Sequence, residues 1–192
     1  MMHYRLWGCL MLGSLLGALL LSSCGQATPQ ASAPEANTFK PQPTREPVAP
    51  VTATDAKVTP FEVTTLDGEP FAVTATPAKP VVLYFMAAWC ASCLPEAQAL
   101  AELQQKYGHD QIDVLVLDVD PGDTAADIQA FREASGLSKH WAHDAEGRVL
   151  KAFQVQALDS TIVIGRDGQI VYRDARPTSL AVLERTIAPL LQ

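Results

Sequence analysis

The sequence predicts an α/β fold with three layers and a mixed central sheet, preceded by an N-terminal β-hairpin. The continuous apolar run 81–86 and the largely apolar segment 112–119 have the character of strands buried on both faces. A segment with helical spacing follows each run, and pairs of short strands linked by turn residues lie before and after this region. A chain that alternates buried strands with helices is expected to form a sheet covered by helices.

The expected folded domain spans residues 58–192. In chain order its elements are a hairpin of strands 61–65 and 71–74, a buried strand 81–86, a helix from about 92 to 107, a buried strand 112–119, a helix 124–135, a hairpin of strands 161–164 and 169–173, and a closing helix 179–191. The turn Leu66–Pro70 indicates the first hairpin and the turn Gly165–Gly168 the second. Asp123 or Thr124 supplies the cap that begins the second helix.

Residues 1–23 are typical of a secretory signal peptide. Arg5 is their only formal charge, and the apolar run Leu6–Leu21 has 16 residues with three glycines. This run is shorter than the ~20 residues of a membrane span. It ends in Leu21-Ser22-Ser23-Cys24, which resembles the bacterial lipobox, in which the cysteine is lipidated and becomes the new N-terminus. We therefore expect an extracytoplasmic protein that is anchored to a bacterial membrane through Cys24.

Residues 24–57 are expected to form a tether after the lipidated cysteine. Residues 25–57 hold six prolines, a single aromatic residue, Phe39, and no apolar period. Such a segment buries too little surface to offset the entropy of ordering, and its prolines favour extended conformations. The tether is therefore predicted to be disordered.

The charge balance excludes one class of partner. The chain of 192 residues carries a formal net charge of −7 and is 48% hydrophobic. An acidic chain offers no positive field to a phosphate backbone, so we expect no nucleic-acid partner.

Candidate chemistry lies between the first buried strand and its helix, in the sequence Trp89-Cys90-Ala91-Ser92-Cys93. Since Cys9 belongs to the signal peptide and Cys24 is lipidated, these two cysteines are the free thiols of the mature chain. The start of a helix stabilises a thiolate through its unpaired N–H groups and dipole. We expect Cys90 to lie at an exposed tip and act as the nucleophile, and Cys93 to resolve the mixed disulfide.

Three other interpretations of the two cysteines remain. A structural disulfide is possible in an oxidising compartment, although a loop of two residues removes little unfolded-state entropy. A zinc site would need His140 and His143 as further ligands, but their spacing is short and the segment looks like a loop. Thiolates also suit Cu(I), so copper handling is a third possibility.

The sequence resembles the thioredoxin superfamily, and most closely its TlpA/ResA-type extracytoplasmic thiol-disulfide oxidoreductases. The resemblance covers roughly 58–192 and rests on Trp89–Cys93, on Glu96 three residues later, on Leu66-Asp67-Gly68, on the strand that ends in Asp118 and Asp120, and on 161–168. It implies a thioredoxin fold, a reversible Cys90–Cys93 disulfide as the sole redox group, and a membrane electron donor. The implied substrates are exported protein thiols and disulfides, in some members apocytochrome c.

Two positions depart from the family pattern. Asp159, after Leu158, stands where the family has a cis-proline facing the disulfide. A cis bond before a non-proline residue costs ~3–4 kcal/mol, so we expect a trans Leu158–Asp159 bond and a carboxylate beside Cys90 that opposes thiolate formation. Tyr84 stands where classical thioredoxins have a buried aspartate, and is either a core aromatic or a hydroxyl near Cys93.

Other residues around the cysteines have a structural and a functional interpretation. Glu96 is either a first-turn acid favourable to the helix dipole or a proton-managing group. Trp89 is expected to pack as a lid, and Ala91 and Ser92 to tune the potential. The sequence thus predicts a thiol-disulfide oxidoreductase, and the alternative is a thioredoxin-like module that binds copper or a protein partner without turnover. A thiol peroxidase is disfavoured because no Pro- and Thr-containing loop precedes Cys90.

Overall fold

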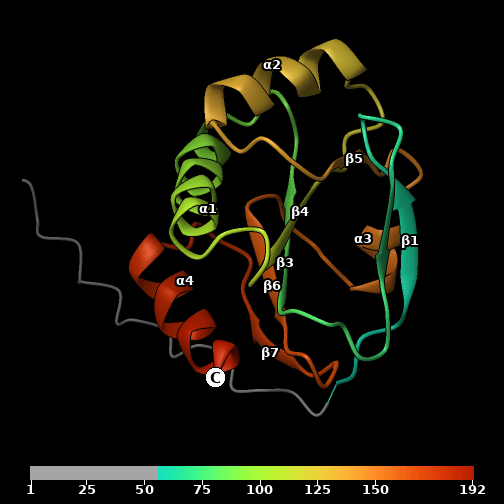
Figure 1. Cartoon of the computed structure of the whole chain (residues 1–192). Helices are drawn as coiled ribbons and strands as arrows, with labels where there is room; N and C mark the ends of the chain where they lie inside the picture. The colour runs from blue at the N-terminus through green and yellow to red at the C-terminus, as the bar shows by residue number, and fades with distance from the viewer. Residues whose placement is uncertain (1–55) are drawn as a thin grey trace, which may run out of the picture. The chain divides into compact units, whose positions relative to one another are not determined.

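A five-stranded mixed sheet in the order β5-β4-β3-β6-β7 forms the centre of the structure (Figure 1). The computed structural model describes residues 56–192, so the expected signal peptide, the lipidation site Cys24 and the tether up to residue 55 lie outside the described residues. The strands and helices are β1 Phe61–Thr64, β2 Pro70–Val73, β3 Val81–Met86, α1 Leu94–Tyr107, β4 Asp113–Asp118, α2 Ala125–Ser135, β5 Trp141–His143, α3 Arg148–Ala152, β6 Ser160–Ile164, β7 Ile170–Arg173 and α4 Leu180–Ile187. Within 56–192, no helix combines the length and the apolar character needed to cross a membrane.

Strand β3 organises the sheet because it pairs on both sides. It runs parallel to β4 and antiparallel to β6, with Tyr84 opposite Val116 and Thr161. All six of its residues are buried, as the continuous apolar run predicts. The parallel pairing places the carboxyl ends of β3 and β4 at one edge, where the cysteine segment begins.

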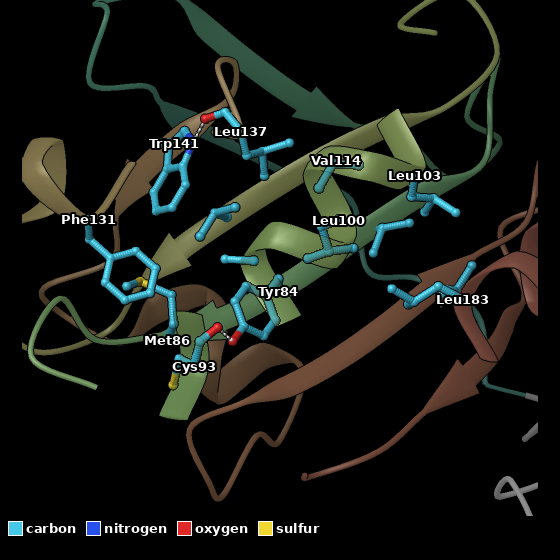
Figure 2. Close-up of a cluster of buried hydrophobic side chains, with 14 of the residues drawn as sticks. Tyr84, Met86, Cys93, Leu100, Leu103, Val114, Phe131, Leu137, Trp141 and Leu183 are labelled. Atoms are coloured by element: carbon cyan, nitrogen blue, oxygen red, sulfur yellow. Dashed lines mark hydrogen bonds between the residues drawn. The ribbon is translucent and has the colours of Figure 1, made fainter. Parts of the chain in front are cut away.

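The two faces of β3 contribute to different cores. Val82, Tyr84 and Met86 join a cluster with residues of α1, α2 and α4 (Figure 2). Leu83 and Phe85 join a second cluster formed with the β1-β2 hairpin and α3. The sheet is therefore covered on both faces, which confirms the expected three-layer fold with an N-terminal hairpin. The hairpin forms a separate two-stranded sheet.

One expectation about the fold is wrong, and one element was missed. The segment around His140 and His143, expected to be a loop, contains the edge strand β5, which pairs parallel to β4. Trp141 explains this, because its buried ring packs against Phe131 and its Nε1–H donates to the Leu137 carbonyl. A three-residue strand is too short to show an alternating pattern. The short helix α3 is likewise absent from the sequence prediction.

The β6–β7 turn requires glycine at Gly168. Its φ is +77°, and a Cβ there would lie 2.0 Å from the Ala75 carbonyl oxygen. The Gly168 carbonyl accepts the Val58 N–H, and Lys57 forms a bridge with Gln169. Lys57 and Val58 are therefore already in contact with the β6–β7 turn, although Lys57 precedes the expected start of the domain at residue 58.

Candidate redox site

Cys90 and Cys93 are joined by a disulfide, with their Cα atoms 5.3 Å apart. Strand β3 ends at Met86, a short 3₁₀-helix covers Ala91–Cys93, and α1 continues directly from it. The Cys93 N–H donates to the Cys90 carbonyl, which tightens this first turn. The expected placement of the two cysteines at the start of a helix is thus observed, although that first turn is 3₁₀ rather than α.

Cys90 and Cys93 differ less in solvent exposure than the sequence predicts. Cys90 is only 6% exposed rather than at an exposed tip, because it packs into the core cluster on the α1 face, and Cys93 is 0% exposed. Cys90 is still the more accessible of the two. Its Sγ lies 3.4 Å from the hydroxyl oxygen of Ser92, while Ala91 and Ser92 themselves are exposed.

Tyr84 connects the second cysteine to the loop before β6. Its buried hydroxyl lies 2.8 Å from the Cys93 carbonyl oxygen and 2.6 Å from Oδ1 of Asp159 (Figure 2 shows the first contact). Burial, followed by the bond to Asp159, raises the pKa of Tyr84 far above its usual value. Tyr84 is therefore both a core aromatic and a hydroxyl next to Cys93.

The carboxylate of Asp159 is directed to Tyr84. Asp159 is 5% exposed, its N–H donates to the Phe85 carbonyl, and none of its hydrogen bonds reaches Cys90. No cis peptide bond occurs among residues 56–192, so Leu158–Asp159 is trans as expected. The φ of Asp159 is +62°, a conformation that aspartate tolerates better than most residues and that proline cannot adopt. Leu158 is partly buried against the α1-face core.

Glu96 is buried rather than a solvated first-turn acid. It is 2% exposed, and its carboxylate accepts the Thr161 hydroxyl at 2.5 Å and the Thr178 N–H at 2.7 Å. Burial raises the pKa of Glu96 to about 8, although these two hydrogen bonds act to lower it. A protonated Glu96 can still serve both partners, since its O–H can donate to Thr161 while its other oxygen accepts from Thr178.

Trp89 lies open to solvent beside Cys90 and does not cover the site as a packed lid. It is 65% exposed, and it is the sole large hydrophobic side chain so exposed within 56–192. Its Nε1–H donates to Oδ2 of Asp120 at 2.5 Å, and this bond holds the pKa of Asp120 below its usual value. The indole is thereby fixed in an outward position.

Two carboxyl groups behind this segment, Asp118 and Asp123, were not expected at the site from the sequence. Asp123 accepts the Ala88 N–H at 2.7 Å and so holds the backbone two residues before Cys90. Asp118 is fully buried, and its Oδ2 has no hydrogen-bond partner. Burial is the main cause that raises the pKa of Asp118 to about 7, and Asp123 adds to it. The available signal was that Asp118 ends a strand parallel to β3 and that Asp123 lies in the loop that follows this strand.

His140 and His143 lie in different surroundings. The ring of His140 contacts Phe71 with centroids 4.7 Å apart, whereas Nε2 of His143 lies 2.8 Å from the Asp120 carbonyl oxygen. Among residues 56–192, no three histidine, cysteine or acidic side chains are grouped so as to hold a metal ion. The two histidines therefore have different neighbours in this structure.

A CxxC disulfide at the junction of a buried central strand and a helix, in a mixed sheet with helices on both faces, defines a thioredoxin-like protein. The chain belongs to the AhpC/TSA family, whose model matches residues 54–173. It is 28% identical to a thioredoxin-like protein from Aeropyrum pernix, with a TM-score of 0.58 over 68% of this chain and 89% of that one. A secreted Mycobacterium tuberculosis disulfide oxidoreductase has the same fold, with 24% identity, a TM-score of 0.59 and coverage of 68% and 96%. The expected thioredoxin fold is confirmed.

One relative of this chain is named for its activity as a thiol-disulfide oxidoreductase. The thiol-disulfide oxidoreductase ResA of Bacillus thuringiensis subsp. konkukian is 30% identical over 111 residues, which are 58% of this chain and 63% of that protein. The chain therefore spans less than two thirds of this relative. The similarity agrees with the ResA-type resemblance of the sequence.

Proposed function

We propose that this protein is an extracytoplasmic thiol-disulfide oxidoreductase that exchanges its Cys90–Cys93 pair with exported proteins. The observation that carries the proposal is a disulfide at a helix start in which one cysteine is fully buried and the other retains 6% exposure. A substrate sulfur has access to Cys90 before Cys93. The name of the ResA relative supports the same reaction class.

The reaction balances without a further cofactor. The reduced protein attacks a substrate disulfide with the Cys90 thiolate, which forms a mixed disulfide and releases one substrate thiolate that takes up a proton. The Cys93 thiolate then attacks Cys90 Sγ, which closes the protein disulfide and releases the second substrate thiol. The substrate gains two electrons and two protons, and the protein loses them. The reverse sequence oxidises a dithiol substrate.

Neighbouring groups are assigned supporting roles in this proposal. Burial raises the pKa of Glu96 to about 8, so its carboxyl group can both hold and release a proton near neutral pH. Glu96 lies one helical turn from Cys93, and in this proposal it exchanges protons with the Cys93 thiol as that thiol is formed or used. The Tyr84 hydroxyl and the Asp159 carboxylate orient the first turn through the Cys93 carbonyl. Trp89, with Ala91 and Ser92, forms the surface on which a substrate docks.

The cellular setting is also part of the proposal. The lipobox at Cys24 would anchor the protein to a bacterial membrane, and the proline-rich segment would hold the domain away from it. The disulfide would be kept in its working state by a membrane electron donor. Exported protein thiols and disulfides, including apocytochrome c, are the proposed substrates.

Trapping of mixed disulfides tests both the function and the roles of the cysteines. Cys93→Ser, expressed as the full chain, is expected to accumulate adducts with exported proteins through Cys90, while Cys90→Ser accumulates few. Equal trapping by both variants would contradict the assignment of roles. The alternative is a binding module, and the absence of the family's cis-proline at Asp159 favours it. This alternative would be established if no adducts form and the reduced wild type binds Cu(I) tightly and stoichiometrically.

A further inference from the structure

A cavity of about 240 Å³ lies beside the loop that leads into β6. Its lining residues are Gln154, Val155, Gln156, Ser160, Arg173, Asp174 and Ala175. Ser160 begins β6 and pairs with Phe85, near the end of β3. The cavity is therefore at the edge of the sheet where β3 ends and the cysteine segment begins, and residues 154–156 of the loop before β6 line it.

Arg173 is a cation without a counter-ion at this cavity. Its side chain is half-buried at the end of β7, and its Nη1 donates to the Phe153 carbonyl at 2.5 Å. None of the ion pairs within 56–192 includes Arg173. Burial lowers the pKa of Arg173, and no carboxylate offsets this effect. The other guanidinium N–H groups remain available to an acceptor that enters the cavity.

The neighbouring carboxylate of Asp174 is already occupied. Its Oδ1 accepts the Thr161 N–H at 3.2 Å, and its Oδ2 accepts the hydroxyl of Tyr172 at 2.5 Å and that of Thr178. Tyr172 belongs to the core on the α1 face, whereas Arg173 contacts the end of α3. Asp174 also lines the cavity, but both of its carboxylate oxygens are engaged by these three groups, and none of the ion pairs within 56–192 joins it to Arg173.

We propose that this cavity receives a carboxylate side chain of the polypeptide substrate, and that Arg173 is a specificity-determining residue. An arginine pairs with a carboxylate through two parallel N–H···O bonds, and such a pair is stronger where water is partly excluded. Val155 and Ala175 provide apolar surface for the methylene groups of an aspartate or glutamate. The inference rests on the proposed function.

The position of the cavity favours a residue of the substrate chain over a free small carboxylate. The loop that lines the cavity continues to Asp159, which reaches Tyr84 and through it the Cys93 carbonyl. A polypeptide whose cysteine reacts at Cys90 can therefore cross this loop and place a nearby side chain at Arg173. A free carboxylate would gain nothing from this arrangement.

The test uses peptides that each contain one disulfide and a single glutamate, moved position by position away from the reacting cysteine, with matched glutamine peptides. For the reduced full chain we expect kcat/KM to be about three- to tenfold higher with glutamate than with glutamine at one or two positions, as for a partly buried charged pair. Arg173→Gln should abolish this ratio, because the loss falls on the glutamate peptides. Arg166→Gln removes the same charge at the exposed far end of the β6–β7 hairpin and should preserve the ratio.

Several outcomes would overturn the inference while leaving the proposed function intact. They are the absence of any glutamate preference in the wild type, an equal preference in Arg173→Gln, and loss of the preference in Arg166→Gln as well. Benzoate, as a free carboxylate probe, separates the two sources of the ligand. If NMR titration shows benzoate binding that depends on Arg173 while the peptides show no preference, the cavity is a small-molecule site and the substrate proposal is wrong. Failure to turn over either peptide set would instead contradict the proposed function.

Discussion

The carboxylate of Asp159 lies 2.6 Å from the hydroxyl oxygen of Tyr84, and the two residues are 75 positions apart in the sequence. The same hydroxyl lies 2.8 Å from the carbonyl oxygen of Cys93. The loop before β6 is thus connected to the first turn after the CxxC segment through one buried oxygen. The Asp159 carboxylate, which was expected beside Cys90, is therefore linked to this first turn through Tyr84.

Replacing Asp159 by asparagine should make the thiols more reactive. The variant removes a buried negative charge, and asparagine tolerates the positive φ at this position. Asp159 is linked through the Tyr84 hydroxyl to the carbonyl of Cys93, and a like charge disfavours a thiolate, so we expect the reduced variant to be alkylated at Cys90 about three to ten times faster near neutral pH. The measurement is the rate of iodoacetamide labelling in single-cysteine Cys93→Ser backgrounds. An unchanged rate would show that this carboxylate does not influence Cys90.

Tyr84→Phe should destabilise the protein without opening a cavity. The substitution removes a single O–H donor that lies within hydrogen-bond distance of both the Asp159 carboxylate and the Cys93 carbonyl. Loss of a buried donor to a charged group costs about 1–3 kcal/mol in the free energy of unfolding, measurable by chemical denaturation of the oxidised protein. Tyr172→Phe removes a similar hydroxyl from Asp174, away from the cysteines, and is the control. Only Tyr84→Phe should also alter the reduction potential of the disulfide.

Ionisation of Glu96 should make stability fall as the pH rises. Burial raises its pKa from 4.5 to about 8, so the folded state favours the protonated form. The resulting contribution is present below pH 4.5 and is lost as the pH rises toward 8, with a total of roughly 3–5 kcal/mol. Denaturation between pH 5 and pH 9 should therefore show a smaller decline for Glu96→Gln than for the wild type.

Asp118 provides the comparison for this experiment, since burial also raises its pKa, to about 7. Part of the decline should remain in Glu96→Gln and disappear when Asp118→Asn is added. Identical pH profiles of the wild type and Glu96→Gln would show that Glu96 does not titrate in this range.

Trp89→Ala should weaken the use of protein substrates while leaving the fold intact. The indole is 65% exposed, so we expect the free energy of unfolding to change by less than about 1 kcal/mol. If Trp89 docks substrates, KM for a protein disulfide should rise about three- to tenfold. Asp120→Ala, which frees the indole N–H, should have a smaller effect in the same direction. Reaction with dithiothreitol is the control, and an equal loss there would exclude a docking role.

Substitutions of Cys24 and Cys9, which lie outside the described residues, test the proposed lipid anchor. Cys24→Ala should block lipidation and processing, so that the protein no longer partitions into the detergent phase of Triton X-114. Cys9→Ala should leave both unchanged, because Cys9 lies within the expected signal peptide. A wild-type mature N-terminus far from Cys24 would contradict the lipobox interpretation.

The strands and helices that pack on the central sheet could be predicted from local patterns. The run Val81–Met86 became β3 with the expected bounds, because a strand buried on both faces needs an unbroken apolar sequence. The CxxC segment at the start of the next helix could also be predicted, since Cys90 and Cys93 are close in sequence. Short elements such as β5 were not, because three residues carry no periodicity and depend on the packing of Trp141.

The polar groups that surround the cysteines could not be predicted from local sequence, because long-range contacts bring them together. Helical spacing placed Glu96 near Cys93, but its burial depends on Thr161 and Thr178, which come from distant parts of the chain. The low exposure of Cys90 likewise results from packing between elements. Local sequence patterns were enough to predict the Cys90–Cys93 pair and the sheet that holds it. Which polar groups meet around that pair, and which of them stay neutral, depends on long-range contacts and desolvation, and these exist only once the chain has folded.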